Sequence, residues 1–126
     1  MKLSSLMTIN AVIAGLFGIA FVGAPARVLA MYGITVDAPF ALVAQLFGAA
    51  LLGYCLLTWT ARNAGPSDAR AAIVLALFVS DAIAFVIALI AQVRHVVNQV
   101  GWSTVAIYLL LALGFGYFQL RKPVSD

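Results

Sequence analysis

Four long stretches of almost wholly apolar residues alternate with short polar connections along the chain. They cover approximately residues 6–24, 40–60, 69–91 and 101–120. A helix needs about 20 apolar residues to cross a hydrocarbon core about 30 Å thick. Spanning β-strands need only about 10 residues and alternate in polarity, and these stretches do not alternate. The pattern therefore predicts an all-α integral membrane protein, a four-helix transmembrane bundle forming the single domain 1–126.

Residues that favour helix ends lie between the apolar stretches. Asp37 is placed to cap the second span, and Ser67 with Asp68 is placed to begin the third. An acidic side chain is favourable there, because the amino end of a helix carries partial positive charge. Lys122 and Pro123 follow the fourth stretch and are expected to end it.

The first connection, residues 25–33, contains a second apolar pattern on a smaller scale. In a short helix at the membrane surface, Val28, Leu29 and Tyr32 would face the lipid and Arg27 would face water. The alternative is an irregular connection of the same length. The sequence is compatible with both.

The composition identifies the solvent of the exterior. Of the 126 residues, 65 % are hydrophobic and 9 % are charged, whereas soluble domains have about 25 % charged residues. So few charged side chains cannot cover the surface of a water-soluble protein of this size, so the lipid bilayer is the expected partner of most of the exterior. The basic residues lie at the ends of apolar stretches, where they suit lipid headgroups rather than nucleic acid.

The distribution of basic residues predicts the orientation. Four spans put both ends of the chain on one side, and short cytoplasmic loops carry the excess of Lys and Arg. The side with the termini carries Lys2, Arg62, Arg70, Arg121 and Lys122. The other side carries Arg27 and Arg94. We therefore expect cytoplasmic termini in a multi-pass protein of the inner, or plasma, membrane.

Small residues spaced four apart indicate where helices can approach one another. Lipid tails are as apolar as leucine, so helices associate in a bilayer through close packing and a few polar contacts. The other spans offer Gly15, Gly18 and Gly53. The third span has a continuous ladder: Ala72, Ala76, Ser80, Ala84 and Ala88. The partner of this ladder can lie in the same chain or in another, and alanine is also simply common in this sequence.

Asp81 is the only acidic or basic residue deep within any of the four apolar stretches, and it lies near the middle of the third span. A charge at the centre of a transmembrane helix costs roughly 2.5–3.5 kcal/mol, and such residues usually face the protein interior. Depth along the helices places polar atoms of Tyr54, Tyr108 and, further away, Asn10 within reach. Two interpretations remain open: a polar link that holds the helices together, or a binding site for a proton, a cation or a polar headgroup.

The sequence offers no set of residues suited to catalysis. The one cysteine, Cys55, lies in an apolar stretch, and the one histidine, His95, lies in a loop. No Ser/His/Asp or Cys/His combination can form inside the membrane, and no phosphate-binding glycine loop is present. We expect no enzyme, no cofactor and no metal site.

Residues 44–54 (AQLFGAALLGY) and 101–108 (GWSTVAIY) resemble segments of small bacterial four-helix inner-membrane proteins. The overall plan is similar to that of DoxX-like proteins, and the likeness covers most of the chain as a likeness of size and helix plan. Some relatives of that plan accompany membrane oxidoreductase complexes. The resemblance thus implies an accessory role and transfers no functional residue.

Two functions follow as expectations. The first is a non-catalytic accessory or structural subunit, which packs against other membrane subunits or against copies of itself. The second is binding or transport of a lipophilic molecule, a proton or a small cation around Asp81.

Overall fold

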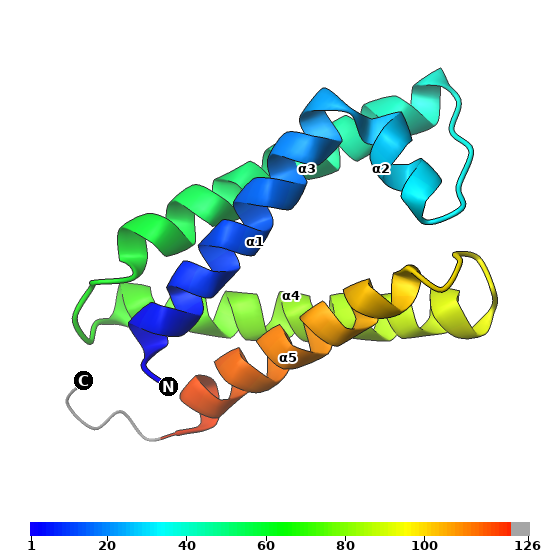
Figure 1. Cartoon of the computed structure of the whole chain (residues 1–126). Helices are drawn as coiled ribbons and strands as arrows, with labels where there is room; N and C mark the ends of the chain where they lie inside the picture. Colours follow the sequence, from blue (N-terminus) through cyan, green and yellow to red (C-terminus); the bar gives the residue numbers. More distant parts are fainter. Residues whose placement is uncertain (122–126) are drawn as a thin grey trace. The chain divides into compact units, whose positions relative to one another are not determined.

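The computed structural model describes residues 1–121. In this part of the chain it contains five α-helices and no strand (Figure 1). Lys122 and Pro123, which we expected to end the last helix, lie outside the described residues. Lys122 is also one of the basic residues that we expected on the side of the termini. The all-α class is confirmed.

Four of the helices are long and apolar enough to cross a membrane, which makes the chain a multi-pass membrane protein. They are α1 (Leu3–Gly23), α3 (Ala38–Ala61), α4 (Asp68–Val93) and α5 (Gly101–Leu120). Each coincides with one predicted span to within about three residues at either end. The fifth helix, α2 (Pro25–Met31), occupies the first connection, so the helical alternative is confirmed there. Its position at a membrane surface stays a prediction.

The predicted helix starts have the expected capping geometry. The Asp37 carboxylate accepts a hydrogen bond from the Phe40 N–H at 3.0 Å. The Ser67 hydroxyl accepts one from the Arg70 N–H at 3.0 Å. The first N–H groups of a helix lack partners within the helix, and these side chains satisfy one such group each.

The chain divides into two compact units, and each is described by itself. One unit is Met7–Arg62, and the other combines Met1–Leu6 with the chain from Asn63 onward. The prediction of a single domain stays a prediction.

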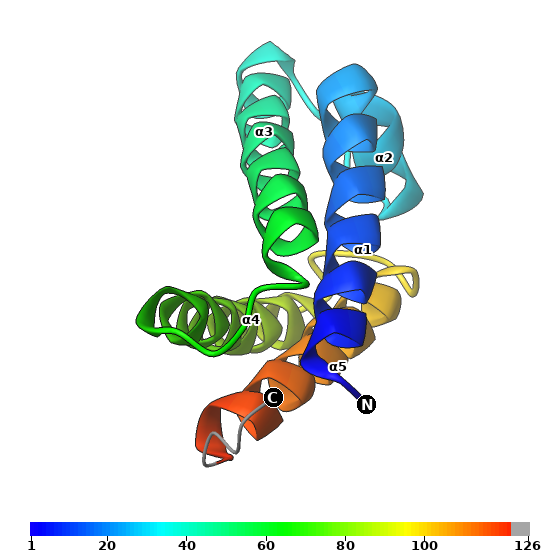
Figure 2. The ribbon, with the colours of Figure 1, turned by 90° about the vertical axis from the view of Figure 1, so that its left-hand side faces the viewer.

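In the unit Met7–Arg62, α1 and α3 lie side by side and antiparallel (Figures 1 and 2). At one end of the pair, the Gln45 side chain donates a hydrogen bond to the Val22 carbonyl at 3.1 Å. At the other end, the Asn10 side chain donates one to the Thr58 hydroxyl at 3.4 Å. These two bonds fix the register of the helix pair.

The short helix α2 packs against one end of this pair. Val28 and Leu29 of α2 are buried in a cluster with Phe21 of α1 and Ala44 of α3. Gly33 closes the helix with a positive φ of 79°, a backbone conformation that glycine adopts without steric cost. Val28 and Leu29, which we expected to face the lipid, therefore pack within the unit instead.

In the other unit, α4 and α5 form an antiparallel pair joined by residues 94–100 (Figures 1 and 2). The buried positions on α4 are Val74, Leu77, Asp81 and Gln92, and those on α5 include Val105, Leu111, Ala112 and Phe115. The Gln92 side chain donates a hydrogen bond to the Asn98 carbonyl at 3.1 Å and so holds the connecting loop.

Candidate functional site

Asp81 lies on the buried side of α4. It follows Val74 and Leu77 at helical spacing, and only 7 % of its surface is exposed. Its Oδ2 atom has no hydrogen-bond partner among the described residues. Buried carboxyl oxygens normally have hydrogen-bond partners, because a buried polar group without one is costly.

The packing of α4 on α5 shows what lies level with Asp81. The Phe78 ring lies against Gly116, where an added Cβ would come within 2.8 Å of the ring. Near the loop, the Gln92 side chain lies against Gly101. In an antiparallel pair with these two contacts, Asp81 is nearly level with Ala112 of α5. Tyr108 is half-buried on the same helix and lies about one turn further toward the loop.

The two other predicted site residues, Asn10 and Tyr54, belong to the unit Met7–Arg62, and Thr58 connects them. Asn10 is 5 % exposed and donates its hydrogen bond to the Thr58 hydroxyl. That hydroxyl in turn donates to the Tyr54 backbone carbonyl at 2.7 Å. The side chain of Tyr54 is exposed. Of the four predicted residues, Asn10 and Tyr54 thus belong to one unit, and Asp81 and Tyr108 belong to the other.

Thr58, which we did not predict from the sequence, is fully buried. A threonine near the end of an apolar stretch does not by itself indicate a contact between helices, because its hydroxyl can bond a carbonyl one turn earlier in its own helix. The signal that could have identified it is the register of α1 against α3, which brings Thr58 level with Asn10.

The small residues selected for packing occupy different environments. Gly15 and Gly18 face α3 closely: an added Cβ would lie 3.0 Å from the Cys55 Sγ and 3.1 Å from the Gly48 carbonyl oxygen, respectively. Gly53 lies on the open side of α3, with nothing within 4 Å. On α4, Ala72 and Ala76 are exposed, whereas the other members are half-buried: Ser80, Ala84 and Ala88.

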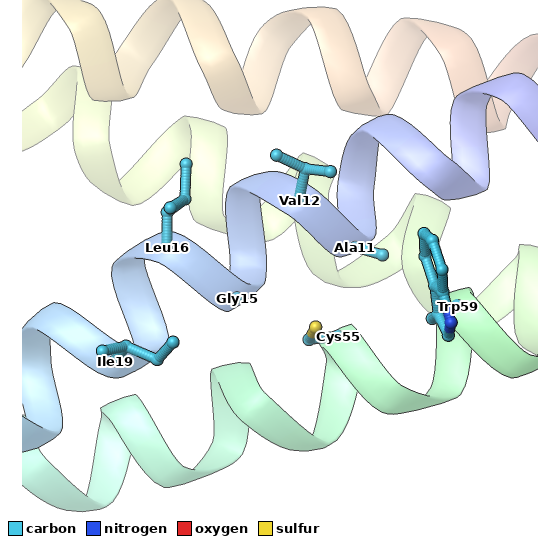
Figure 3. A pocket seen from close by; sticks show the side chains of 7 residues that line it. All are labelled: Ala11, Val12, Gly15, Leu16, Ile19, Cys55 and Trp59. Atoms are coloured by element: carbon cyan, nitrogen blue, oxygen red, sulfur yellow. The ribbon is translucent and has the colours of Figure 1, made fainter.

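An apolar groove runs between α1 and α3 and has a volume of about 270 Å³. Figure 3 shows Cys55 and Trp59 of α3 reaching toward Ala11 and Gly15 of α1. Apart from the indole nitrogen, the side chains lining it present only carbon, hydrogen and sulfur: Ala11, Val12, Gly15, Leu16, Ile19, Cys55 and Trp59. No signal in the sequence marks this groove, because its lining residues come from two segments more than thirty residues apart.

Within residues 1–121, no group of three or more His, Cys, Asp or Glu side chains is arranged to hold a metal ion. Comparison with protein-family models, with curated proteins and with solved structures finds no match to this chain.

Proposed function

We propose that this protein is a non-catalytic subunit of the bacterial inner membrane, which assembles laterally with a larger membrane complex or with copies of itself. The observation that carries the proposal is the exposure of Ala72 and Ala76, two steps of the small-residue ladder on α4. Small residues four apart form a smooth ladder on a helix, and α5 does not cover this part of the ladder.

The physical argument is that association in a bilayer depends on close packing. A helix face without large side chains lets a second helix approach closely, and van der Waals contact between the backbones then favours the pair over lipid. The short connections between the helices offer little surface for another activity. The DoxX-like resemblance of residues 44–54 and 101–108 supports the same accessory role.

Native mass spectrometry of the protein extracted in mild detergent tests this proposal. We expect the protein to leave the membrane with fixed partners or as an oligomer of constant size. Ala72→Leu combined with Ala76→Leu should abolish that assembly, because two larger side chains interrupt the ladder. Ala106→Leu, at an exposed alanine of α5, is the matched control and should leave the assembly intact. If the unsubstituted protein is extracted only as a monomer without any partner, the proposal is contradicted.

A second candidate is binding or transport of a proton, a small cation or a lipophilic molecule around Asp81. The unpartnered Oδ2 atom of this buried carboxyl favours it. Asp81→Asn and Asp81→Leu separate the two roles when flux is measured in reconstituted vesicles. If Asp81 exchanges a proton or binds a cation, Asp81→Asn abolishes the flux although the protein folds. If Asp81→Asn keeps full function and only Asp81→Leu fails to fold, the residue is a polar link.

A further inference from the structure

The groove between α1 and α3 has the length and lining of a site for one hydrocarbon chain. Its residues on α1 run from Ala11 to Ile19, which is about 12 Å at 1.5 Å per residue. One leaflet of a bilayer is about half of a hydrocarbon core about 30 Å thick. At Gly15 the groove has no side chain from α1, and Cys55 faces this position from α3. The groove is therefore slightly shorter than one leaflet is thick, and this length suits part of one acyl chain.

Arg62 places a positive charge beside Trp59, at one end of the groove. The guanidinium carbon of Arg62 lies 3.8 Å from the centre of the Trp59 ring. The same guanidinium donates a hydrogen bond to the Trp59 carbonyl through Nη1. A guanidinium has five N–H groups, so this bond leaves several of them for another acceptor. Arg62 is thus held beside the groove while keeping donors to offer.

The surroundings of Arg62 favour an anion. Asp37 is the only acidic residue between positions 7 and 62. It caps the opposite end of α3, so no carboxylate of this unit neutralises Arg62. Tryptophan favours the boundary between hydrocarbon and headgroups. A guanidinium can bind a phosphate through two parallel N–H bonds.

We infer that this groove is a binding site for an anionic phospholipid, with one acyl chain between α1 and α3 and the phosphate on Arg62. The occupant is a membrane lipid rather than a free phosphate, because the apolar groove and the guanidinium adjoin one another through Trp59. A lipid with net negative charge is preferred over a zwitterionic one, because the headgroup of the latter carries its own cation.

Quenching of Trp59 fluorescence by lipids with brominated acyl chains tests the site. Trp102→Phe leaves Trp59 as the only tryptophan. The protein in mild detergent is titrated with brominated phosphatidylglycerol or with brominated phosphatidylcholine. We expect the Kd for phosphatidylglycerol to be lower by about fivefold, which corresponds to about 1 kcal/mol for one basic residue at an anionic surface.

Variants of the cation separate its role from a structural one. Arg62→Gln should remove the fivefold preference, and Arg62→Lys should retain most of it, because the charge is kept. Arg27→Gln, at an exposed arginine outside the groove, should change nothing. Equal Kd values for the two lipids in the starting protein, or a preference that survives Arg62→Gln, would overturn the inference.

A second pair of variants tests the acyl chain. Leu16→Ala removes an exposed lining residue and should weaken the binding of both lipids. Leu46→Ala, at an equally exposed leucine of α3 outside the groove, should not. If the two variants bind the lipids with the same Kd, the acyl chain does not lie in this groove and the inference is overturned.

Discussion

Gly101 and Gly53 differ in how much space surrounds them. At Gly101, the start of α5, an added Cβ would collide with the Gln92 side chain and with Val97. Gln92 also holds the loop through Asn98, so it cannot move without releasing that contact. At Gly53, inside α3, an added Cβ meets no atom within 4 Å.

Gly101→Ala should therefore lower the free energy of unfolding, by about 1–3 kcal/mol as is typical of an overpacked site. The matched control, Gly53→Ala, should be neutral or stabilising by up to about 1 kcal/mol, since alanine favours a helix interior. Unfolding in mixed detergent micelles with increasing dodecyl sulfate measures both. Equal effects of the two substitutions would contradict the packing described at Gly101.

At the residue scale, the sequence predicted the positions that local chemistry determines. The caps at Asp37 and Ser67 follow from the preference of these residue types for helix starts. Thr58 could not be found in the same way, since its role depends on the register between two helices. The groove at Cys55 and Trp59 depends on that register too.

At the scale of elements, α1 and α3 depend on few polar contacts. The bond from Asn10 to Thr58 is the buried one, whereas the bond from Gln45 to Val22 lies on the exposed side. Between these bonds the backbones approach closely: a Cβ added at Gly48 would lie 2.9 Å from the Gly18 carbonyl oxygen. Close packing and one buried hydrogen bond thus act together along this helix pair.

Thr58→Val should destabilise the pair by about 0.6 kcal/mol, the average for hydrogen bonds between transmembrane helices, and by at most about 1.7 kcal/mol. Valine keeps the shape of threonine but leaves the Asn10 amide without its acceptor. Thr60→Val is the matched control, because the Thr60 hydroxyl bonds only carbonyls of its own helix at the exposed surface. The same detergent unfolding experiment compares them, and a Thr58→Val variant as stable as Thr60→Val would argue against the buried bond.

The helices themselves were predictable because length and apolar composition determine them. The prediction for residues 101–120 coincides with α5 at both ends. The predictions for 40–60 and 69–91 were two residues or fewer short at each end, because a helix can continue past the end of its apolar stretch and hydropathy does not mark the last helical residue. The first connection stayed open between two alternatives, since seven residues are too few to establish a helix by periodicity alone.

At the scale of the whole molecule, the outward side chains are apolar over all four long helices. Leu46 of α3, Ile87 of α4 and Leu110 of α5 are each more than 60 % exposed. In water such a surface would be costly, at about 25 cal/mol for each Å² of apolar area. In hydrocarbon it carries no such cost. The proposed assembly through α4 and the proposed lipid site both depend on this surface facing lipid.

Spin labelling in reconstituted vesicles tests that claim most directly. In a Cys55→Ala background, a nitroxide is attached at single cysteines replacing Leu46, Ile87 and Leu110, and at the exposed loop position Gly65 as a control. We expect molecular oxygen, but not a water-soluble nickel chelate, to reach the three helix positions, and we expect the chelate to reach Gly65. Chelate access at the three helix positions, equal to that at Gly65, would contradict it.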